Sequence, residues 1–133
     1  ACPVLLDGRP VLACLLLARE AEGRELLTIE GLAQAHVAAG GQGADALQEA
    51  FDRCGALQCG FCQSGMILSA RALLARHPAP REDEVRQALS GNLCRCTGYT
   101  QILQAVALAV AEACGQPAPR RAWEPAAPPG EER

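Results

Sequence analysis

Two apolar runs near the start of the chain, CPVLL and VLACLLL, stand on either side of Asp7-Gly8. An Asp-Gly pair between apolar runs is typical of a β-hairpin, so the pattern predicts strands at about 2–6 and 11–17. A single hairpin is only marginally stable in water, and the pattern predicts no further strand downstream. We therefore expect the hairpin to belong to a sheet whose other strands lie upstream of residue 1.

From Thr28 onward the apolar residues recur at helical spacing. Thr28 is the predicted N-cap of a short helix that ends near Ala35, and the segment AAGGQG at 38–43 interrupts the pattern. Further helices are predicted over 44–54, 63–76, 81–90 and 99–114. The second of these ends at His77-Pro78, because the residue before a proline disfavours the α region. The positions predicted to face a core are Ala44, Leu47, Ala50, Phe51, Met66, Ile67, Ala70, Leu73, Leu74, Val85, Leu89, Ile102, Val106, Ala109, Val110 and Ala113.

The predicted fold class is α+β, with a strand hairpin followed by an all-α bundle of four-helix type. We expect three parts, at 1–24, 25–114 and 115–133. The last part holds five of the nine prolines and several charges, so we expect it to be extended or disordered, or to lie on a partner.

The composition narrows the class of protein further. The net charge of −3 argues against a nucleic-acid partner, which would normally require a basic patch. No apolar run reaches the ~20 residues that a membrane span needs, and no signal peptide is evident, so we expect a cytoplasmic protein. Eight cysteines are many for 133 residues, and in a reducing compartment they indicate metal or redox chemistry rather than disulfides.

Four of the cysteines form two close pairs, Cys59 and Cys62 as C-x2-C and Cys94 and Cys96 as C-x-C. Both pairs fall next to helix ends, where two turns can face each other. Thiolates suit zinc and iron–sulfur clusters. A zinc-stabilised structural or interaction module without a redox role is one interpretation. The spacing favours an iron–sulfur cluster, because a C-x-C pair strains both bonds to a lone tetrahedral ion.

Two longer motifs carry a family resemblance. ALQCGFCQSGMILSARALL at 56–74 and LSGNLCRCTGY at 89–99 closely resemble the iron–sulfur subunit of the molybdenum hydroxylases, the group of xanthine dehydrogenase, aldehyde oxidoreductase and carbon monoxide dehydrogenase. The resemblance runs from residue 1 to about residue 113. It implies an inner [2Fe–2S] cluster in the helical part, with ligands that match Cys59, Cys62, Cys94 and Cys96.

The resemblance also implies an outer [2Fe–2S] cluster in a plant-ferredoxin-like β-grasp domain. Two of its ligands match Cys2 and Cys14, and the other two have no counterpart in this chain. We therefore expect 1–24 to be the remnant of that domain, in a sequence that begins inside the cluster loop. A disulfide between Cys2 and Cys14 is the alternative.

The partners implied by the resemblance are a large subunit that binds molybdopterin and a medium subunit that binds FAD. Gln58 and Cys96 would lie nearest the pterin. The chain would relay electrons from molybdenum to FAD or another acceptor and would not turn over substrate by itself. One departure is Gln63-Ser64, where many relatives have Thr-Pro; this is a weak indication of the branch.

The remaining candidates have plainer interpretations. Cys54 and Cys114 match no ligand of the motif, so we expect them to pack as small apolar side chains. Phe61 and Met66 are predicted to pack and to keep water from the cluster. Arg95, between two ligands, either faces the large subunit or is a solvated surface residue.

Overall fold

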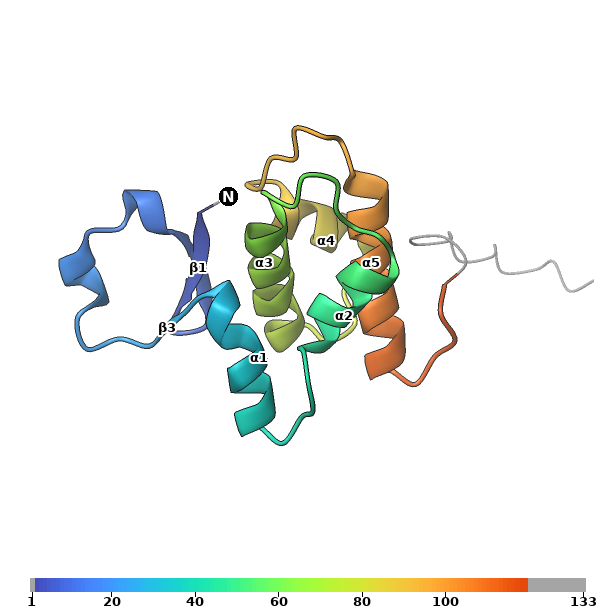
Figure 1. The fold of residues 1–133 in the computed structure, drawn as a ribbon, viewed down its shortest axis with the longest axis horizontal. Helices are drawn as coiled ribbons and strands as arrows, with labels where there is room; N and C mark the ends of the chain where they lie inside the picture. The colour runs from blue at the N-terminus through green and yellow to red at the C-terminus, as the bar shows by residue number, and fades with distance from the viewer. Residues whose placement is uncertain (1, 120–133) are drawn as a thin grey trace, which may run out of the picture.

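The computed structural model describes residues 2–119 and combines a small sheet with five helices in that part of the chain (Figure 1). The strands are β1 (Pro3–Leu6), β2 (Arg9–Leu12) and β3 (Leu26–Leu27), and two 3-10 turns lie at η1 (Ala13–Leu15) and η2 (Ala18–Ala21). The helices are α1 (Ile29–Ala38), α2 (Ala46–Arg53), α3 (Gln63–Arg76), α4 (Glu82–Leu89) and α5 (Tyr99–Ala113). Of the predicted tail at 115–133, residues 120–133 lie outside the described residues.

The sheet is antiparallel, in the order β2-β1-β3. Asp7 and Gly8 have φ values of 48° and 73°, the positive values that a two-residue hairpin turn requires. The predicted strand at 11–17 is wrong beyond Leu12. Because β1 has only four residues, it pairs with four in β2, and the chain then turns into η1.

The expectation of no further strand is also wrong. β3 pairs with β1 opposite Leu5 and Leu6. The Asp7 carboxylate helps to hold the returning chain there, because its two oxygens accept hydrogen bonds from Arg24 Nε at 2.6 Å and from the Glu25 N–H at 3.0 Å. A strand of two residues has no alternation pattern that sequence could reveal.

Helix α3 is the centre of the molecule, with the sheet and α1 on one side and α2, α4 and α5 on the other (Figure 1). Seven of its fourteen residues are buried. Leu68 and Ala72 pack against Leu5 of the sheet, whereas Met66 and Ile67 belong to the main core with α2 and α5. Hence α3 joins the hairpin to the helices as one packed unit.

Most of the predicted core positions are buried or packed against the core. Ala113 is a correction, because it is exposed at the last residue of α5. Near this end of α5, an ion pair at the surface joins α2 to α5, with Arg53 Nη1 2.6 Å from Glu112 Oε1. The buried part of α5 therefore ends at Ala111, two residues before the helix does.

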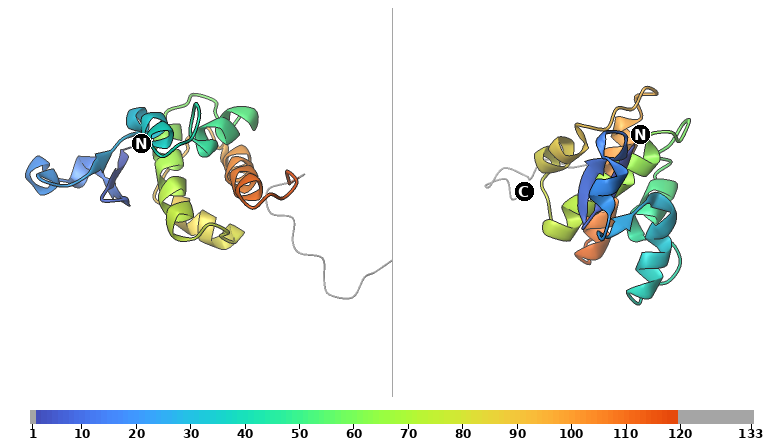
Figure 2. Two further views of the ribbon diagram at one scale, coloured as in Figure 1. Left: turned by 90° about the horizontal axis from the view of Figure 1, so that it is seen from below. Right: turned by 90° about the vertical axis from the view of Figure 1, so that its left-hand side faces the viewer.

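The segments between α2 and α3 and between α4 and α5 lie together at one end of the helices, with the N-terminal end of β1 close by (Figures 1 and 2). These two segments carry the close cysteine pairs. Among the described residues, no helix is both long enough and apolar enough to cross a membrane.

Candidate metal centre

The first cysteine loop connects α2 to α3. Gly60 adopts φ 79°, a left-handed conformation that favours glycine, and its carbonyl accepts a hydrogen bond from the Gln63 N–H at 3.1 Å. The turn ends at Cys62, the N-cap residue of α3. Cys59 and Cys62 therefore lie on a tight turn at the positively polarised end of a helix.

The second cysteine loop precedes α5. Thr97 has φ 61°, a conformation that costs a residue with a Cβ roughly 1–2 kcal/mol and that recurs at functional sites. The next residue, Gly98, is the N-cap of α5, and its carbonyl accepts the Ile102 N–H at 3.1 Å. The strained turn places Cys94 and Cys96 beside the N-terminus of a second helix.

The four thiols meet across the two loops as two pairs. Cys59 and Cys96 lie close enough for each thiol to shift the pKa of the other, and so do Cys62 and Cys94. Each pair joins one member of the C-x2-C motif to one member of the C-x-C motif. The loops therefore converge as the sequence predicts, and all four thiols are free.

In the first pair, Cys59 is the thiol that loses its proton more readily. The Phe61 N–H donates to its sulfur and, together with the Cys96 thiol, lowers the pKa of Cys59. The same contact between the thiols raises the pKa of Cys96. The contact thus makes Cys59 the more acidic and Cys96 the less acidic thiol of the pair.

In the second pair, Cys94 is the thiol that loses its proton more readily. The Gly98 N–H donates to its sulfur and is the largest cause that lowers the pKa of Cys94. Burial, followed by the hydrogen bond with Cys94, raises the pKa of Cys62 to about 11. Because a thiolate is the form that binds metal, occupation of either pair must release the protons that its thiols carry.

Two facing pairs of thiols fit a two-iron cluster, in which four cysteines are divided between two irons. A zinc site of four thiolates instead places all four around one ion. The pairing of the thiols thus favours the iron–sulfur interpretation over zinc.

Gln58 contacts the second loop directly. Its side-chain amide donates to the Cys96 carbonyl at 3.2 Å, and the side chain is exposed at the same end of the molecule as the thiols. Gln58 and Cys96, the two residues that the resemblance places toward a pterin, are therefore neighbours.

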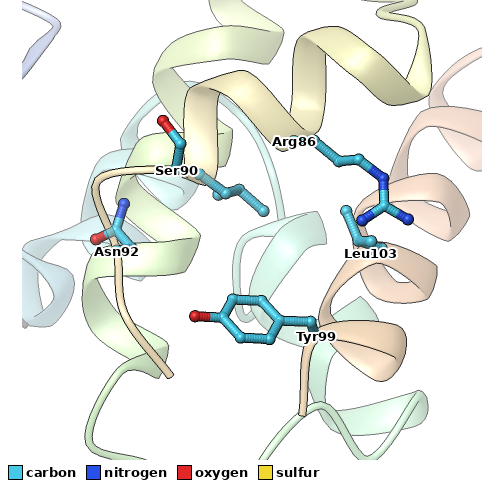
Figure 3. Close-up of a pocket in the computed structure, with 6 residues that line it drawn as sticks. Arg86, Ser90, Asn92, Tyr99 and Leu103 are labelled. Atoms are coloured by element: carbon cyan, nitrogen blue, oxygen red, sulfur yellow. The ribbon is translucent and has the colours of Figure 1, made fainter. Parts of the chain in front are cut away.

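Tyr99 holds the second cysteine loop through a hydrogen bond to its backbone. The Cys94 N–H donates to the Tyr99 hydroxyl at 2.8 Å. The tyrosine ring borders a pocket of about 190 Å³ together with Asn92, Ser90, Arg86 and two leucines (Figure 3). Sequence reasoning did not single out Tyr99 or Asn92; the only signal was their position inside the long motif that carries both cysteines.

The two predicted outer ligands also lie together. The sulfurs of Cys2 and Cys14 are 3.0 Å apart, both as free thiols. A backbone bond from the Ala13 N–H to the Cys2 carbonyl, 2.9 Å long, sets this approach. Their mutual hydrogen bond lowers the pKa of Cys2 and raises that of Cys14.

Two packing predictions are wrong. Phe61 is 79% exposed, because Cys59 and Cys62 turn toward the second loop and leave Gly60 and Phe61 between them at the tip of the turn. Cys114 is exposed, since it follows the last residue of α5 beyond the core. Packing is confirmed for Cys54, which contacts the core and whose pKa is raised by burial, and for Met66, which is fully buried.

Residues 28–107 match a protein family described as [2Fe-2S] binding domain. The nicotine 6-hydroxylase small subunit of Paenarthrobacter nicotinovorans is 49% identical over 106 residues, which cover 80% of this chain and 60% of that protein. The xanthine dehydrogenase iron-sulfur-binding subunit of Escherichia coli O157:H7 is 46% identical over 111 residues, which cover 80% of this chain and 64% of that protein.

The solved structures that resemble this chain are also oxidoreductases. Quinoline 2-oxidoreductase from Pseudomonas putida 86 matches with a TM-score of 0.74 and 52% identity, over 86% of this chain and 67% of that one. Aldehyde oxidoreductase from Desulfovibrio gigas matches with a TM-score of 0.75 and 38% identity, over 86% of this chain and 12% of that one. The chain thus spans only part of each relative, and 60–66% of the length of the nicotine and nicotinate enzymes' small subunits.

Proposed function

The chain belongs to the [2Fe-2S] binding domain family, in the group of iron–sulfur subunits of molybdenum hydroxylases, and we propose that it relays electrons within such an enzyme complex. The observation that carries the proposal is the pairing of four thiols across two loops, Cys59 with Cys96 and Cys62 with Cys94. The relay connects the molybdenum centre of a large subunit to FAD in a medium subunit or to another acceptor. Substrate chemistry belongs to the large subunit.

Cys59, Cys62, Cys94 and Cys96 are the residues that would hold the inner cluster. A [2Fe–2S] cluster held by them would take up and release single electrons. The chain's own contribution is a set of positive dipoles around the sulfurs. These come from the N–H groups of Phe61 and Gly98 and from the N-termini of α3 and α5, and they stabilise negative charge there.

The exposed end of the two loops is the proposed contact with the large subunit. Phe61 and Leu93 flank the cysteines and are 79% and 83% exposed, which is typical of apolar side chains that a partner protein covers. Gln58 and Cys96, adjacent in this surface, would face the pterin of molybdopterin. Arg95, also exposed, lies in the same loop.

Cys2 and Cys14 are proposed as two of the four ligands of an outer cluster. Their 3.0 Å approach supports this role, and residues 1–24 would then be part of a ferredoxin-like β-grasp domain that precedes the helical domain at 25–114 and a tail at 115–133. We place the complex in the cytoplasm, where eight unbridged thiols suit the reducing conditions.

The test is EPR spectroscopy of the anaerobically reduced protein, purified in its complex, with iron, acid-labile sulfide and zinc quantified on the same sample. Iron and sulfide in equal amounts and a rhombic signal from a reduced [2Fe–2S] cluster are expected. Stoichiometric zinc with no signal after dithionite would overturn the proposal in favour of a structural zinc module.

A further inference from the structure

Three segments that carry cysteines meet at a single glycine, Gly65, in the first turn of α3. Gly65 follows Cys62 by three positions and is buried. A Cβ at this position would lie 2.7 Å from Asn92 Oδ1, 2.7 Å from Pro3 Cδ and 3.0 Å from Pro3 Cγ. Real Cβ atoms are not found so close to other atoms, so the space beside Gly65 does not admit even a methyl group.

The two neighbours of Gly65 connect it to both cysteine sites. Pro3 directly follows Cys2 and is buried in β1. Asn92 precedes Cys94 by two positions, is 7% exposed, and is fixed by a 2.9 Å hydrogen bond from its amide to Ser69 Oγ on α3. The segment next to the Cys2–Cys14 pair is thereby pressed against the helix and the loop that carry the four inner thiols.

We propose that Gly65 is a positioning residue that sets the separation between the Cys2–Cys14 site and the four-cysteine site, and through it the rate of electron exchange between them. The inference rests on the proposed function, since it requires a cluster at each site. The physical reason is that electron tunnelling slows steeply with distance. Glycine is unfavourable in a helix, and here its lack of a side chain lets β1 and α3 approach closely.

Gly65→Ala tests this directly, in the full-length protein with both clusters. The added methyl group must displace Pro3, which moves the hairpin away from α3, or Asn92, which moves the second cysteine loop. Gly31→Ala is the matched control. It is also a helical glycine near the sheet, but its Cβ would meet only the flexible end of the Leu27 side chain, at 3.1 Å.

The readout is EPR of the fully reduced protein, in which two nearby paramagnetic clusters split each other's signals, together with freeze-quench measurement of equilibration between the clusters. In Gly65→Ala we expect both clusters to keep their individual signals, the splitting to diminish or be lost, and equilibration to slow. Gly31→Ala should match the wild type. Unchanged splitting and rate in Gly65→Ala would overturn the inference, whereas a wild type with no iron–sulfur signal would overturn the proposed function itself.

If Gly65→Ala loses a cluster, the double variant Gly65→Ala/Pro3→Ala tests whether the loss comes from the contact of the new methyl group with Pro3. Alanine at position 3 lacks the two ring atoms that the new methyl group meets. Recovery of both clusters and of the splitting would support the inference. Failure of the double variant to recover, while Pro3→Ala alone keeps both clusters, would place the effect at Asn92 Oδ1, which the methyl group still meets, and would overturn the inference that Gly65 sets the separation through Pro3 and β1.

Discussion

The Asn92 side-chain amide donates a hydrogen bond of 2.9 Å to the hydroxyl of Ser69, and both side chains are buried. Asn92 is in the loop that leads to Cys94, and Ser69 is in the middle of α3. The bond therefore ties the second cysteine loop to the helix that begins at the first.

Replacement of Asn92 with Ala is expected to destabilise the fold. A buried hydroxyl left without its partner costs roughly 1–3 kcal/mol, and the second cysteine loop would lose its anchor. Urea unfolding of Asn92→Ala, Ser69→Ala and the double variant measures the coupling. If the two single effects simply add, the hydrogen bond is not the source of the loss.

Asp45 caps the N-terminus of α2 and is expected to contribute measurably to stability. Its side chain accepts the Leu47 N–H at 3.0 Å, Gln48 completes the capping box, and Arg71 Nε lies 3.2 Å from its second oxygen. Asp45→Ala should lower the free energy of unfolding by about 1–2 kcal/mol. Asp52→Ala, at an exposed position of the same helix, is the control and should change it by less than about 0.5 kcal/mol.

The hairpin turn is expected to make stability depend on acid pH through Asp7. The Arg24 guanidinium and the Glu25 N–H hold the pKa of this carboxyl below its usual range. A lowered folded pKa means that the stabilisation is complete above the unfolded value of about 4 and is lost as the pH falls through the folded value.

The urea midpoints of wild type and Asp7→Asn, compared from pH 7 to pH 3, provide the measurement. The wild type should be the more stable above about pH 5, and the difference should shrink below about pH 4. An Arg24→Gln background should reduce the difference at every pH. A difference that grows toward acid would contradict the assignment.

Tyr99→Phe isolates the hydroxyl that accepts the Cys94 N–H, because it keeps the ring that borders the pocket. Loss of one such bond is expected to cost about 0.5–1.5 kcal/mol and to alter the EPR g-values of the inner cluster, since the freed N–H lies beside a ligand. Unfolding and spectra that match the wild type would show that the loop does not depend on this bond.

Cys59→Ala should abolish the inner cluster signal and lower the iron and sulfide content, because it removes one of the four ligands. Cys54→Ala is the matched control, since Cys54 is the C-cap residue of α2 and packs against the core without joining either pair. A full signal from Cys59→Ala would show that the ligands are assigned wrongly.

The helices could be predicted closely from the sequence because their ends carry local signals. The helix at 63–76 matches α3 in full, with Cys62 before it and Pro78 after it. The sheet could be predicted only in part. The Asp-Gly turn is a local signal, but the end of β2 depends on the length of its partner β1, and β3 depends on contacts from Asp7 to residues 24–25.

The candidate site likewise has features that the sequence predicts and features that depend on the backbone conformation of the loops. The cysteine spacing and the family motifs identified which four thiols converge. Which thiol faces which depends on the turn at Gly60 and the positive φ of Thr97, and a threonine carries no local signal for that conformation. The exposure of Phe61 could not be predicted either, since hydrophobicity alone does not distinguish a packing residue from one that awaits a partner.

The pairing of Cys62 with Cys94 also has a topological consequence. Any group that bonds to both sulfurs closes the chain from the start of α3 through α4 into a ring of about 30 residues, as a disulfide would. In a chain-entropy description, closing a ring of that size removes disorder from the unfolded chain worth roughly 3–4 kcal/mol. The second pair, Cys59 with Cys96, encloses the first ring, so the inserted metal group would act as a double cross-link, and its loss would loosen α3 and α4 together.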